Sequence, residues 1–353
     1  MPKPPFIRPI THIDWPSIEQ GRLSNGLPYA LVRRGTQEVV RVDYVFWAGR
    51  PFEAHRLVGR ATAALLREGS RQYSGVALAE HFDFYGASLS VPYQTDVTNV
   101  ALYSLSQHIP QLLPHFMELL INPVFTEKDL QAYIRRQQHE LREDLTQNDV
   151  LAYRHITEAY YGPDHPYGYN SYPETYDALQ LDWLQAHHRR CYQAQNGFLL
   201  ISGQFDQATE QHLLRAGETL PEGSALSPSP LVATPSPAGY YFYHNEGPPQ
   251  SAIRIGRPLF PRTHADANGM HILASLLGGF FGSRLMMNLR EDKGYTYHVS
   301  AAYDSLAFDG SIQIELETSH AYVAPALQEV KQELRRLREE PIPDKELQTW
   351  AET

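Results

Sequence analysis

The stretch LLGGFFGSRLMMNLREDKGYTYHVSAAY, residues 276–303, decides the fold class of this chain. It begins inside an apolar pattern that predicts a helix over about 266–290. It ends in an aromatic, alternating pattern that predicts a strand over 295–304. A second strand over 310–319 and a helix over about 320–339 follow. Elements in this order favour an α+β fold, in which helices cover one face of a sheet.

The chain before this stretch follows the same order of elements. In the first half, a strand pair with an Asn-Gly turn signal lies within residues 23–49, and a second pair lies within 87–105 after a helical region. In the second half, the strands GYYFYH (239–244) and QSAIRIGRP (250–258) precede the helix. The repeated order predicts two copies of one module, each a mixed, mostly antiparallel sheet with helices packed on one face.

A segment dense in Pro, Ser and Gly divides the chain. Residues 219–238 have a composition that cannot pack a core, so we interpret them as a linker. We expect an N-terminal extension over 1–21, a first module over 22–218 and a second module over 239–353. The second module is shorter and its pattern stops in mid-helix, so we expect its C-terminal part to be missing.

Composition excludes several classes of partner. The 353 residues carry a formal net charge of -10, and such an acidic chain repels nucleic acid and anionic membranes. No apolar run approaches the roughly 20 residues of a membrane span, and the Pro-rich start does not resemble a signal peptide. The single cysteine, Cys191, cannot form an internal disulfide. We expect a cytoplasmic protein, with a periplasmic one as the alternative if a signal peptide was removed.

Three stretches point to one known family. LSNGLPYALV (23–32) is similar to the opening strand of that family, GPDHPYGYN (162–170) to its His-Pro loop, and residues 276–303 to its second-half signature. Over about residues 20–353 the chain resembles the insulinase/pitrilysin (M16) zinc metallopeptidases. The resemblance implies two homologous M16-type modules of the LuxS/MPP-like fold, with the second module truncated at its C-terminus.

The catalytic motif of the M16 family, H-x-x-E-H, is absent from this sequence. In the family, two imidazoles one helical turn apart bind zinc, and the glutamate activates the metal-bound water. Aligned on the closing Gly69-Ser70, the three motif positions here are Arg60, Ala63 and Ala64. Neither a guanidinium nor a methyl group offers a lone pair. We therefore predict no metal and no cofactor in this chain, with zinc expected in a partner subunit.

The resemblance places the family's third zinc ligand at Glu140. One carboxylate does not hold a catalytic zinc, which needs about three protein ligands. Glu140 is then either a helix-surface carboxylate or the partner of Arg60 in an ion pair that fills the vacant metal position. His187 and Cys191 are also one helical turn apart, but two donors are too few for a metal site.

The second-half signature carries a second candidate pair. The resemblance implies that Arg290 and Tyr297 bind the substrate backbone near a zinc ion. Arg is always charged and Tyr has a hydroxyl donor, so both can stabilise an oxyanion that develops on a scissile carbonyl. The structural alternative is a surface arginine at a helix end and an aromatic residue packed in the core.

These features predict a non-catalytic subunit of a heterodimeric peptidase. The resemblance implies a homologous partner with an intact H-x-x-E-H, which performs the zinc endopeptidase chemistry. This chain would bind extended peptide or unfolded polypeptide, supply Arg290 and Tyr297 in trans, and be inactive alone. Three alternatives stay open: self-association instead of a heterodimer, a structural or assembly scaffold, and a zinc peptidase with atypical ligands.

Overall fold

The structure, a computed structural model, describes three stretches of the chain: residues 12–228, 231–245 and 249–351. Contacts between residues divide the chain into two compact units. The first unit comprises Trp15–Leu141 and Ser171–Leu231. The second unit comprises Arg142–Asn170 and the described residues from Val232 onwards. The fold is therefore mixed α/β, with one sheet in each unit.

The first unit contains a six-stranded sheet in the order β1-β2-β6-β3-β5-β4. Strands β2 and β6 run parallel, and all other neighbours run antiparallel. The Asn-Gly signal predicted in the sequence forms the turn between β1 and β2, where Gly26 has a φ of 84°. The strands are β1 (Glu19–Arg22), β2 (Pro28–Arg33), β3 (Val39–Phe46), β4 (Ser88–Ser90), β5 (Thr98–Leu105) and β6 (Gly197–Gly203).

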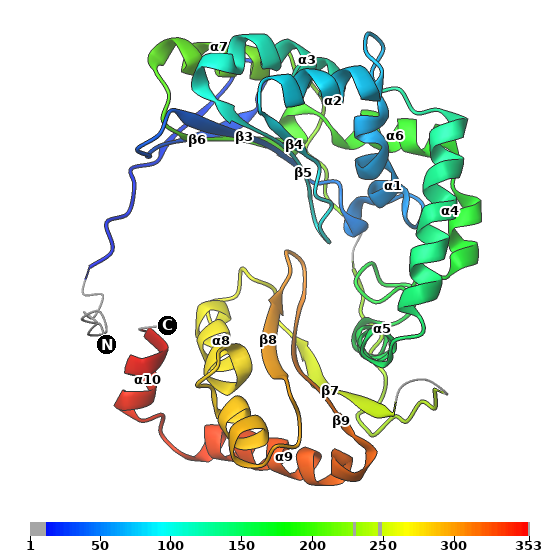
Figure 1. The fold of residues 1–353 in the computed structure, drawn as a ribbon, viewed down its shortest axis with the longest axis vertical. Helices are drawn as coiled ribbons and strands as arrows, with labels where there is room; N and C mark the ends of the chain where they lie inside the picture. The colour runs from blue at the N-terminus through cyan, green and yellow to red at the C-terminus, as the bar shows by residue number, and fades with distance from the viewer. Residues whose placement is uncertain (1–11, 229–230, 246–248, 352–353) are drawn as a thin grey trace, which may run out of the picture. The chain divides into compact units, whose positions relative to one another are not determined.

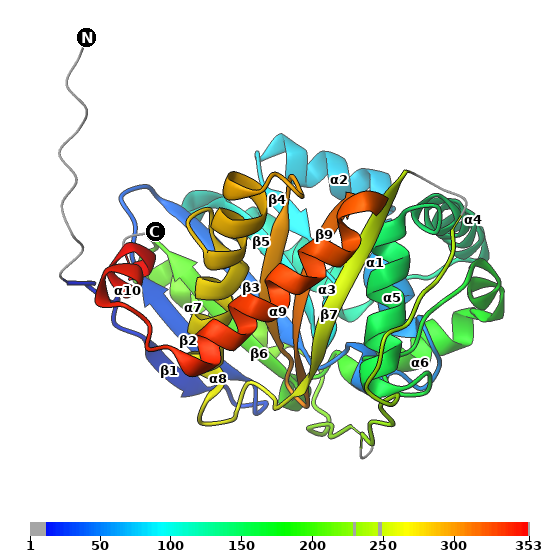
Figure 2. The same cartoon turned by 90° about the horizontal axis from the view of Figure 1, so that it is seen from below.

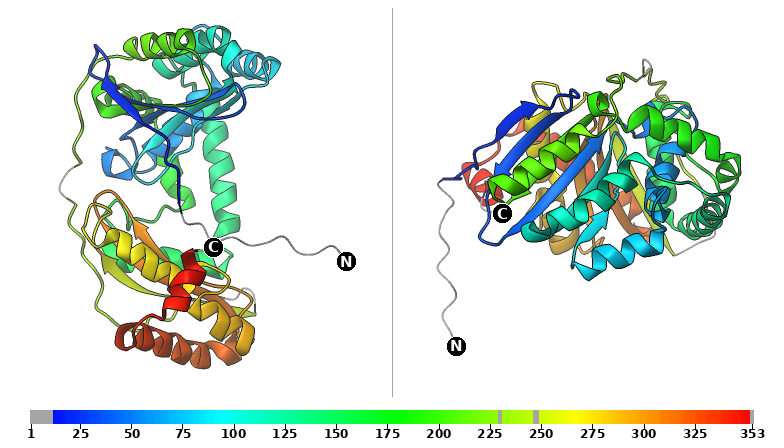
Figure 3. Two further views of the ribbon diagram at one scale, coloured as in Figure 1. Left: turned by 90° about the vertical axis from the view of Figure 1, so that its left-hand side faces the viewer. Right: turned by 90° about the horizontal axis from the view of Figure 1, so that it is seen from above.

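Helices cover one face of this sheet, as Figure 1 shows for α2, α3 and α7. In the right-hand view of Figure 3 the same three helices lie in front of the strands. The core forms where α3 meets β3: the rings of Phe116 and Tyr44 lie 5.9 Å apart, and both side chains are buried. The helices begun in this unit are α1 (Val58–Leu65), α2 (Gly75–Phe84), α3 (Ile109–Ile121), α4 (Glu127–Asp144), α6 (Leu181–Cys191) and α7 (Gln207–Glu218).

The second unit contains a three-stranded antiparallel sheet in the order β7-β9-β8. Helices α8 and α9 lie on one face of it (Figure 2). Ala326 and Val330 of α9 share an apolar cluster with Val299, Ile314 and Leu316 of the sheet. The elements are α5 (Asn148–Tyr161), β7 (Gln250–Leu259), α8 (Ala267–Ala274), β8 (Val299–Ser305), β9 (Gly310–Ser319), α9 (Val323–Glu339) and α10 (Asp344–Ala351). None of the helices in the described part of the chain has both the length and the apolarity of a membrane span.

The strand predicted over residues 239–244 is not formed. The described residues there have no strand structure, and the Phe242 side chain is 84% exposed. Tyr240 lies beside Lys331 of α9, whose ammonium nitrogen is 5.0 Å from the ring centre, and the Tyr243 ring stacks on His155 of α5 at 3.5 Å. The prediction relied on aromatic content, but a strand also needs a neighbouring strand to satisfy its backbone groups.

The single helix predicted over residues 266–290 is also wrong. Helix α8 passes into a π-helical turn, η6 (Ser275–Gly279), and a second π-helical segment, η7 (Met286–Asp292), follows after a break. Gly278 explains part of this shape, because it lies directly against β8. A Cβ atom at this position would be 2.4 Å from the backbone nitrogen of Ala301.

The predicted linker 219–238 contains the boundary between the two units, which falls after Leu231. On its C-terminal side, the backbone N–H groups of Thr234 and Ser236 donate to carbonyl oxygens of α5 at 2.9 and 2.8 Å. At the N-terminus, residues 1–11 of the predicted extension lie outside the described residues, and residues 19–21 belong to strand β1. The domain assignment as a whole stays a prediction.

The two adjacent histidines of α6 are buried in the first unit. His187 Nε2 lies 3.1 Å from the carbonyl oxygen of Ala48, and His188 Nε2 lies 2.9 Å from that of Leu120. Burial lowers the pKa of both imidazoles to about 4. Each ring therefore acts as a neutral donor that satisfies a buried carbonyl group.

We predict that Gly278→Ala lowers the free energy of unfolding by about 1–3 kcal/mol, because the added methyl group cannot fit against β8. Gly269 in α8 is the matched control, since a Cβ atom there meets no other atom within 4 Å. Gly269→Ala should leave stability unchanged or raise it by about 0.5–1 kcal/mol. Urea unfolding of both variants is the measurement, and equal effects would contradict this account of the π-helical turn.

We also predict that acid destabilises the fold through His187 and His188. Below the ordinary pKa of 6.5, the unfolded chain binds protons that the folded chain excludes. The free energy of unfolding should thus fall as the pH drops from about 6.5 towards 4, by about 2 kcal/mol per histidine at pH 5. In urea titrations from pH 7 to 5, His188→Gln should reduce this dependence, whereas the exposed His139→Gln should not.

Candidate functional site

Helix α1 carries the three positions that align with the zinc motif. Its first turn is fixed by the Glu53 carboxylate, which accepts the backbone N–H groups of Leu57 at 3.2 Å and Gly59 at 2.9 Å. Leu57 has a φ of 71°, a left-handed conformation that costs about 1–2 kcal/mol in a non-glycine residue. Arg60 is exposed and Ala63 is buried. The carboxylate therefore compensates for a strained helix start.

Glu140 lies on α4 and does not pair with Arg60. Its carboxylate lies 4.0 Å from Nε of Arg136, and the side-chain amide of Gln137 donates a hydrogen bond to it. Arg60 forms no ion pair among the residues that the structure describes. The hypothesised Arg60–Glu140 ion pair is thus wrong. Neighbours one helical turn apart satisfy the carboxylate locally, at a lower entropic cost than a contact between two helices.

Two buried tyrosines lie near these positions. The rings of Tyr133 on α4 and Tyr176 are 6.3 Å apart, and burial raises the pKa of both phenols. The Arg60 guanidinium opposes this shift at both tyrosines, whereas the Glu140 carboxylate adds to it at Tyr176. Arg60 and Glu140 are therefore close enough to act on the same phenol, although they do not touch.

The residues at this position do not fit a zinc ion. Arg60 brings its own positive charge, the two alanines have no ligand atom, and Glu140 is a single carboxylate. Within the described residues, no group of three His, Cys, Asp or Glu side chains is arranged to hold a metal. His187 Nδ1 and Cys191 Sγ lie 3.8 Å apart, but burial raises the pKa of the thiol to about 11, so it is not a thiolate ligand at neutral pH.

Arg290 and Tyr297 lie on the surface of the second unit. Arg290 stands near the end of η7, with Nε 3.4 Å from the Glu291 carboxylate and the guanidinium carbon 5.3 Å from the centre of the Phe281 ring. Tyr297 follows η7 and is 88% exposed, so it is not the core aromatic residue of the structural alternative. Its phenol has no hydrogen-bond partner among the described residues.

The backbone around Tyr297 is held by its neighbour Thr296. The hydroxyl of this buried threonine donates to the carbonyl oxygen of Glu317 at 2.6 Å, which attaches the loop to β9. An exposed side chain on a fixed backbone can meet a ligand with little loss of backbone entropy. The sequence analysis did not predict the hydrogen bond of Thr296, although Thr296 lies between two tyrosines and could have been singled out.

The match to a known family model spans the boundary between the two units. Residues 178–351 match the family model described as the peptidase M16 inactive domain. The non-peptidase homolog YmxG of Helicobacter pylori is 23% identical over 279 residues, which are 76% of this chain and 64% of that relative. A Rickettsia bellii protein named uncharacterized zinc protease is 23% identical over 333 residues, which are 90% of this chain and 78% of that relative.

A solved structure agrees with these relatives. The crystal structure of the peptidase M16 inactive domain from Pseudomonas fluorescens matches with a TM-score of 0.86 at 22% identity, and the match covers 95% of this chain and 82% of that chain. At this identity the likeness shows the fold. The chain spans just under two thirds of the length of the Helicobacter relative. The matched model, the relatives and the fold agree: residues 178–351 of this chain are similar to the peptidase M16 inactive domain, and the chain has the fold of that structure.

Proposed function

We propose that this chain is the non-catalytic subunit of a two-subunit M16 peptidase and binds extended peptide for a zinc-bearing partner. The observation that carries the proposal is the exposure of Tyr297 and Arg290 on a chain whose α1 helix offers no zinc ligand. A phenol without an internal partner and a guanidinium on the surface have little structural role. Both are suited to contact a bound polypeptide.

The chemistry assigned to this chain is limited to binding and charge stabilisation. Arg290 and Tyr297 would donate hydrogen bonds to the carbonyl oxygen of the scissile bond, where negative charge develops. The weak pairing of Arg290 with Glu291, at 3.4 Å, leaves further N–H donors of the guanidinium available. Amide hydrolysis itself belongs to the partner, a homologous subunit with an intact H-x-x-E-H.

The substrate we propose is an unfolded polypeptide or peptide, held by strand addition. Strand β4 at one end of the first unit's sheet is hydrogen-bonded to β5 alone, and its serines are exposed. Such an edge offers backbone groups to an extended chain. Backbone recognition reads little sequence, which suits a subunit that presents many different peptides.

We also infer that the two units are copies of one module. The order β3-β5-β4 in the first unit corresponds to β7-β9-β8 in the second, and both triplets are antiparallel throughout. The truncation of the second module and the cytoplasmic location stay predictions.

A scaffold without any peptidase role is the second candidate. It is favoured by one finding, the name of the Helicobacter relative, which calls that protein a non-peptidase homolog. The two candidates differ in what Arg290 and Tyr297 do. A scaffold has no use for a donor pair aimed at a scissile carbonyl, so mutation of the pair separates the two functions.

We predict that Arg290→Ala and Tyr297→Phe each lower kcat/KM of the reconstituted pair by about 100-fold, because each removes a donor to the developing oxyanion. The substrate would be a quenched fluorescent peptide, and the partner a homologue with the intact motif. Arg335→Ala is the matched control, since Arg335 is an exposed arginine on α9 of the same unit. Unchanged hydrolysis by both site variants would contradict the role that we propose for Arg290 and Tyr297 in the partner's active site.

We predict that the triple variant Arg60→His, Ala63→Glu, Ala64→His binds about one zinc ion per chain through the new imidazoles and Glu140. The unaltered chain should contain no stoichiometric zinc by elemental analysis. Adding Glu140→Gln to the triple variant should weaken zinc binding at least about tenfold, because a ligand is lost. A folded triple variant without metal would show that α1 and Glu140 are not aligned as the family motif requires.

A further inference from the structure

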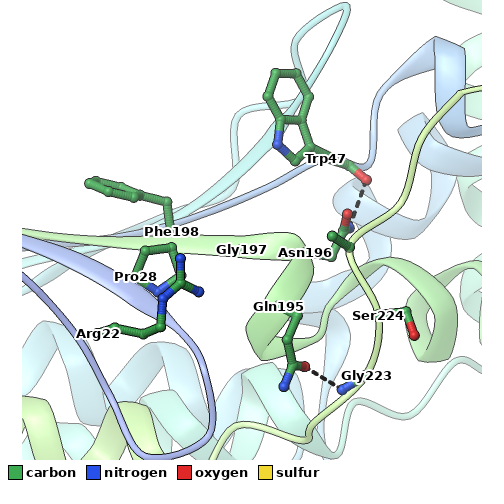
Figure 4. A pocket seen from close by; sticks show the side chains of 10 residues that line it. Arg22, Pro28, Trp47, Gln195, Asn196, Gly197, Phe198, Gly223 and Ser224 are labelled. Atoms are coloured by element: carbon green, nitrogen blue, oxygen red, sulfur yellow. Dashed lines mark hydrogen bonds between the residues drawn. The ribbon is translucent and has the colours of Figure 1, made fainter.

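A cavity of about 750 Å³ lies in the first unit, where strand β6 begins. Figure 4 shows the side chains that line it, with Trp47 and Phe198 around the start of β6 and Arg22 beside Pro28. None of these residues belongs to α1, and all of them lie in the first unit, away from the sequence positions of Arg290 and Tyr297. The lining of the cavity therefore shares no residue with the candidate site described above.

The cavity presents aromatic surface to solvent. Phe198 is 37% exposed although it lies on a strand in the middle of the sheet order, and the Trp47 side chain is half-buried beside Phe52, with the rings 5.7 Å apart. Pro28 and Ala225 add further apolar atoms to the lining. A concave apolar surface of this kind gains free energy when an apolar group covers it.

One wall of the cavity is held in place by amide side chains. Gln195 Oε1 accepts the backbone N–H of Gly223, Gln193 Oε1 accepts that of Ser224 at 3.3 Å, and Asn196 Oδ1 accepts that of Leu226 at 3.2 Å. Asn196 Nδ2 also donates to the carbonyl oxygen of Trp47 at 3.0 Å (Figure 4). Three backbone N–H groups within the irregular segment 223–226 are thus bonded to side chains, so the wall is preformed.

One residue that lines the cavity, Arg22, is a cation without a carboxylate partner among the described residues. The exposed Arg22 donates from Nη1 to the carbonyl oxygen of Gly26 at 2.6 Å, and it forms no ion pair with any carboxylate that the structure describes. The chain has a net charge of -10, so acidic side chains outnumber basic ones, and an arginine without an acidic partner is unexpected. A guanidinium in this position attracts a carboxylate and can bind it through two N–H donors.

We propose that this cavity binds a polypeptide segment in which one apolar side chain, best an aromatic one, is followed by a carboxylate. The apolar side chain covers Trp47 and Phe198, and the carboxylate pairs with Arg22. A free C-terminus and an Asp or Glu side chain supply the same group. The cavity would act in the lone chain, without the zinc-bearing partner, so this proposal and the proposed function can fail independently.

The test uses the full chain and three acetylated peptides in calorimetric titrations: Ala-Ala-Ala-Phe with a free carboxylate, the same peptide as its amide, and Ala-Ala-Phe-Asp amide. We expect the free acid to bind about tenfold more tightly than its amide, because only the acid pairs with Arg22. The third peptide tells the two carboxylate sources apart. Equally tight binding of acid and amide, or no binding of any peptide at millimolar concentration, would overturn the proposal.

Two pairs of variants assign the effect to the cavity. Arg22→Gln should abolish the preference for the acid, whereas Arg135→Gln, at an exposed arginine of α4, should keep it. Phe198→Ala should weaken all peptides about tenfold, whereas Phe84→Ala, at an 81% exposed residue of α2, should change nothing. Ala225→Trp fills the cavity from an exposed position and should block binding even if Phe198→Ala does not fold. Binding that survives Ala225→Trp in a folded chain would place the peptide elsewhere.

Discussion

Zinc binding depends on lone pairs that converge on one point, and helix α1 presents a guanidinium and two methyl groups at the aligned positions instead. Helix α1 of the first unit therefore offers no ligand to a zinc ion. Glu53 still holds the start of the helix in place, and Tyr133 and Tyr176 still pack beside it, so the surrounding structure persists without the metal. At these positions α1 carries the cationic guanidinium of Arg60 and no side chain that could bind a metal.

Each unit offers surface groups that its own structure does not need. In the second unit these are the hydroxyl of Tyr297 and the guanidinium of Arg290, and in the first unit they are Arg22 and the aromatic lining beside it. In both places the backbone is held by polar side chains, Thr296 in one and the amides of Gln195 and Asn196 in the other. A fixed backbone that carries exposed donors lowers the entropic cost of binding a ligand, which supports both of the binding sites that we propose.

Much of this fold was predictable from the sequence, and the failures have physical causes. The alternating pattern of QSAIRIGRP predicts a strand, and β7 forms there. Residues 239–244 are rich in aromatic residues, but a strand forms only where a neighbouring strand is present, and the local sequence does not show this. In the π-helical turn η6, Gly278 lies against Ala301, a residue that is distant in sequence, so no local pattern predicts this contact. The residue types at the candidate site could be aligned from the sequence, and the pair of Arg136 and Glu140 has the spacing of one helical turn. The cavity around Trp47 could not be predicted, because it depends on tertiary packing.

The burial of Cys191 has a practical consequence. Its side chain is fully shielded, and burial raises its thiol pKa to about 11, so very little thiolate is present near neutral pH and none of it is accessible. Maleimide and iodoacetamide should therefore not react with Cys191 while the chain is folded. A cysteine engineered on the surface would then be the sole attachment point for a dye or spin label, and the natural protein needs no prior cysteine removal.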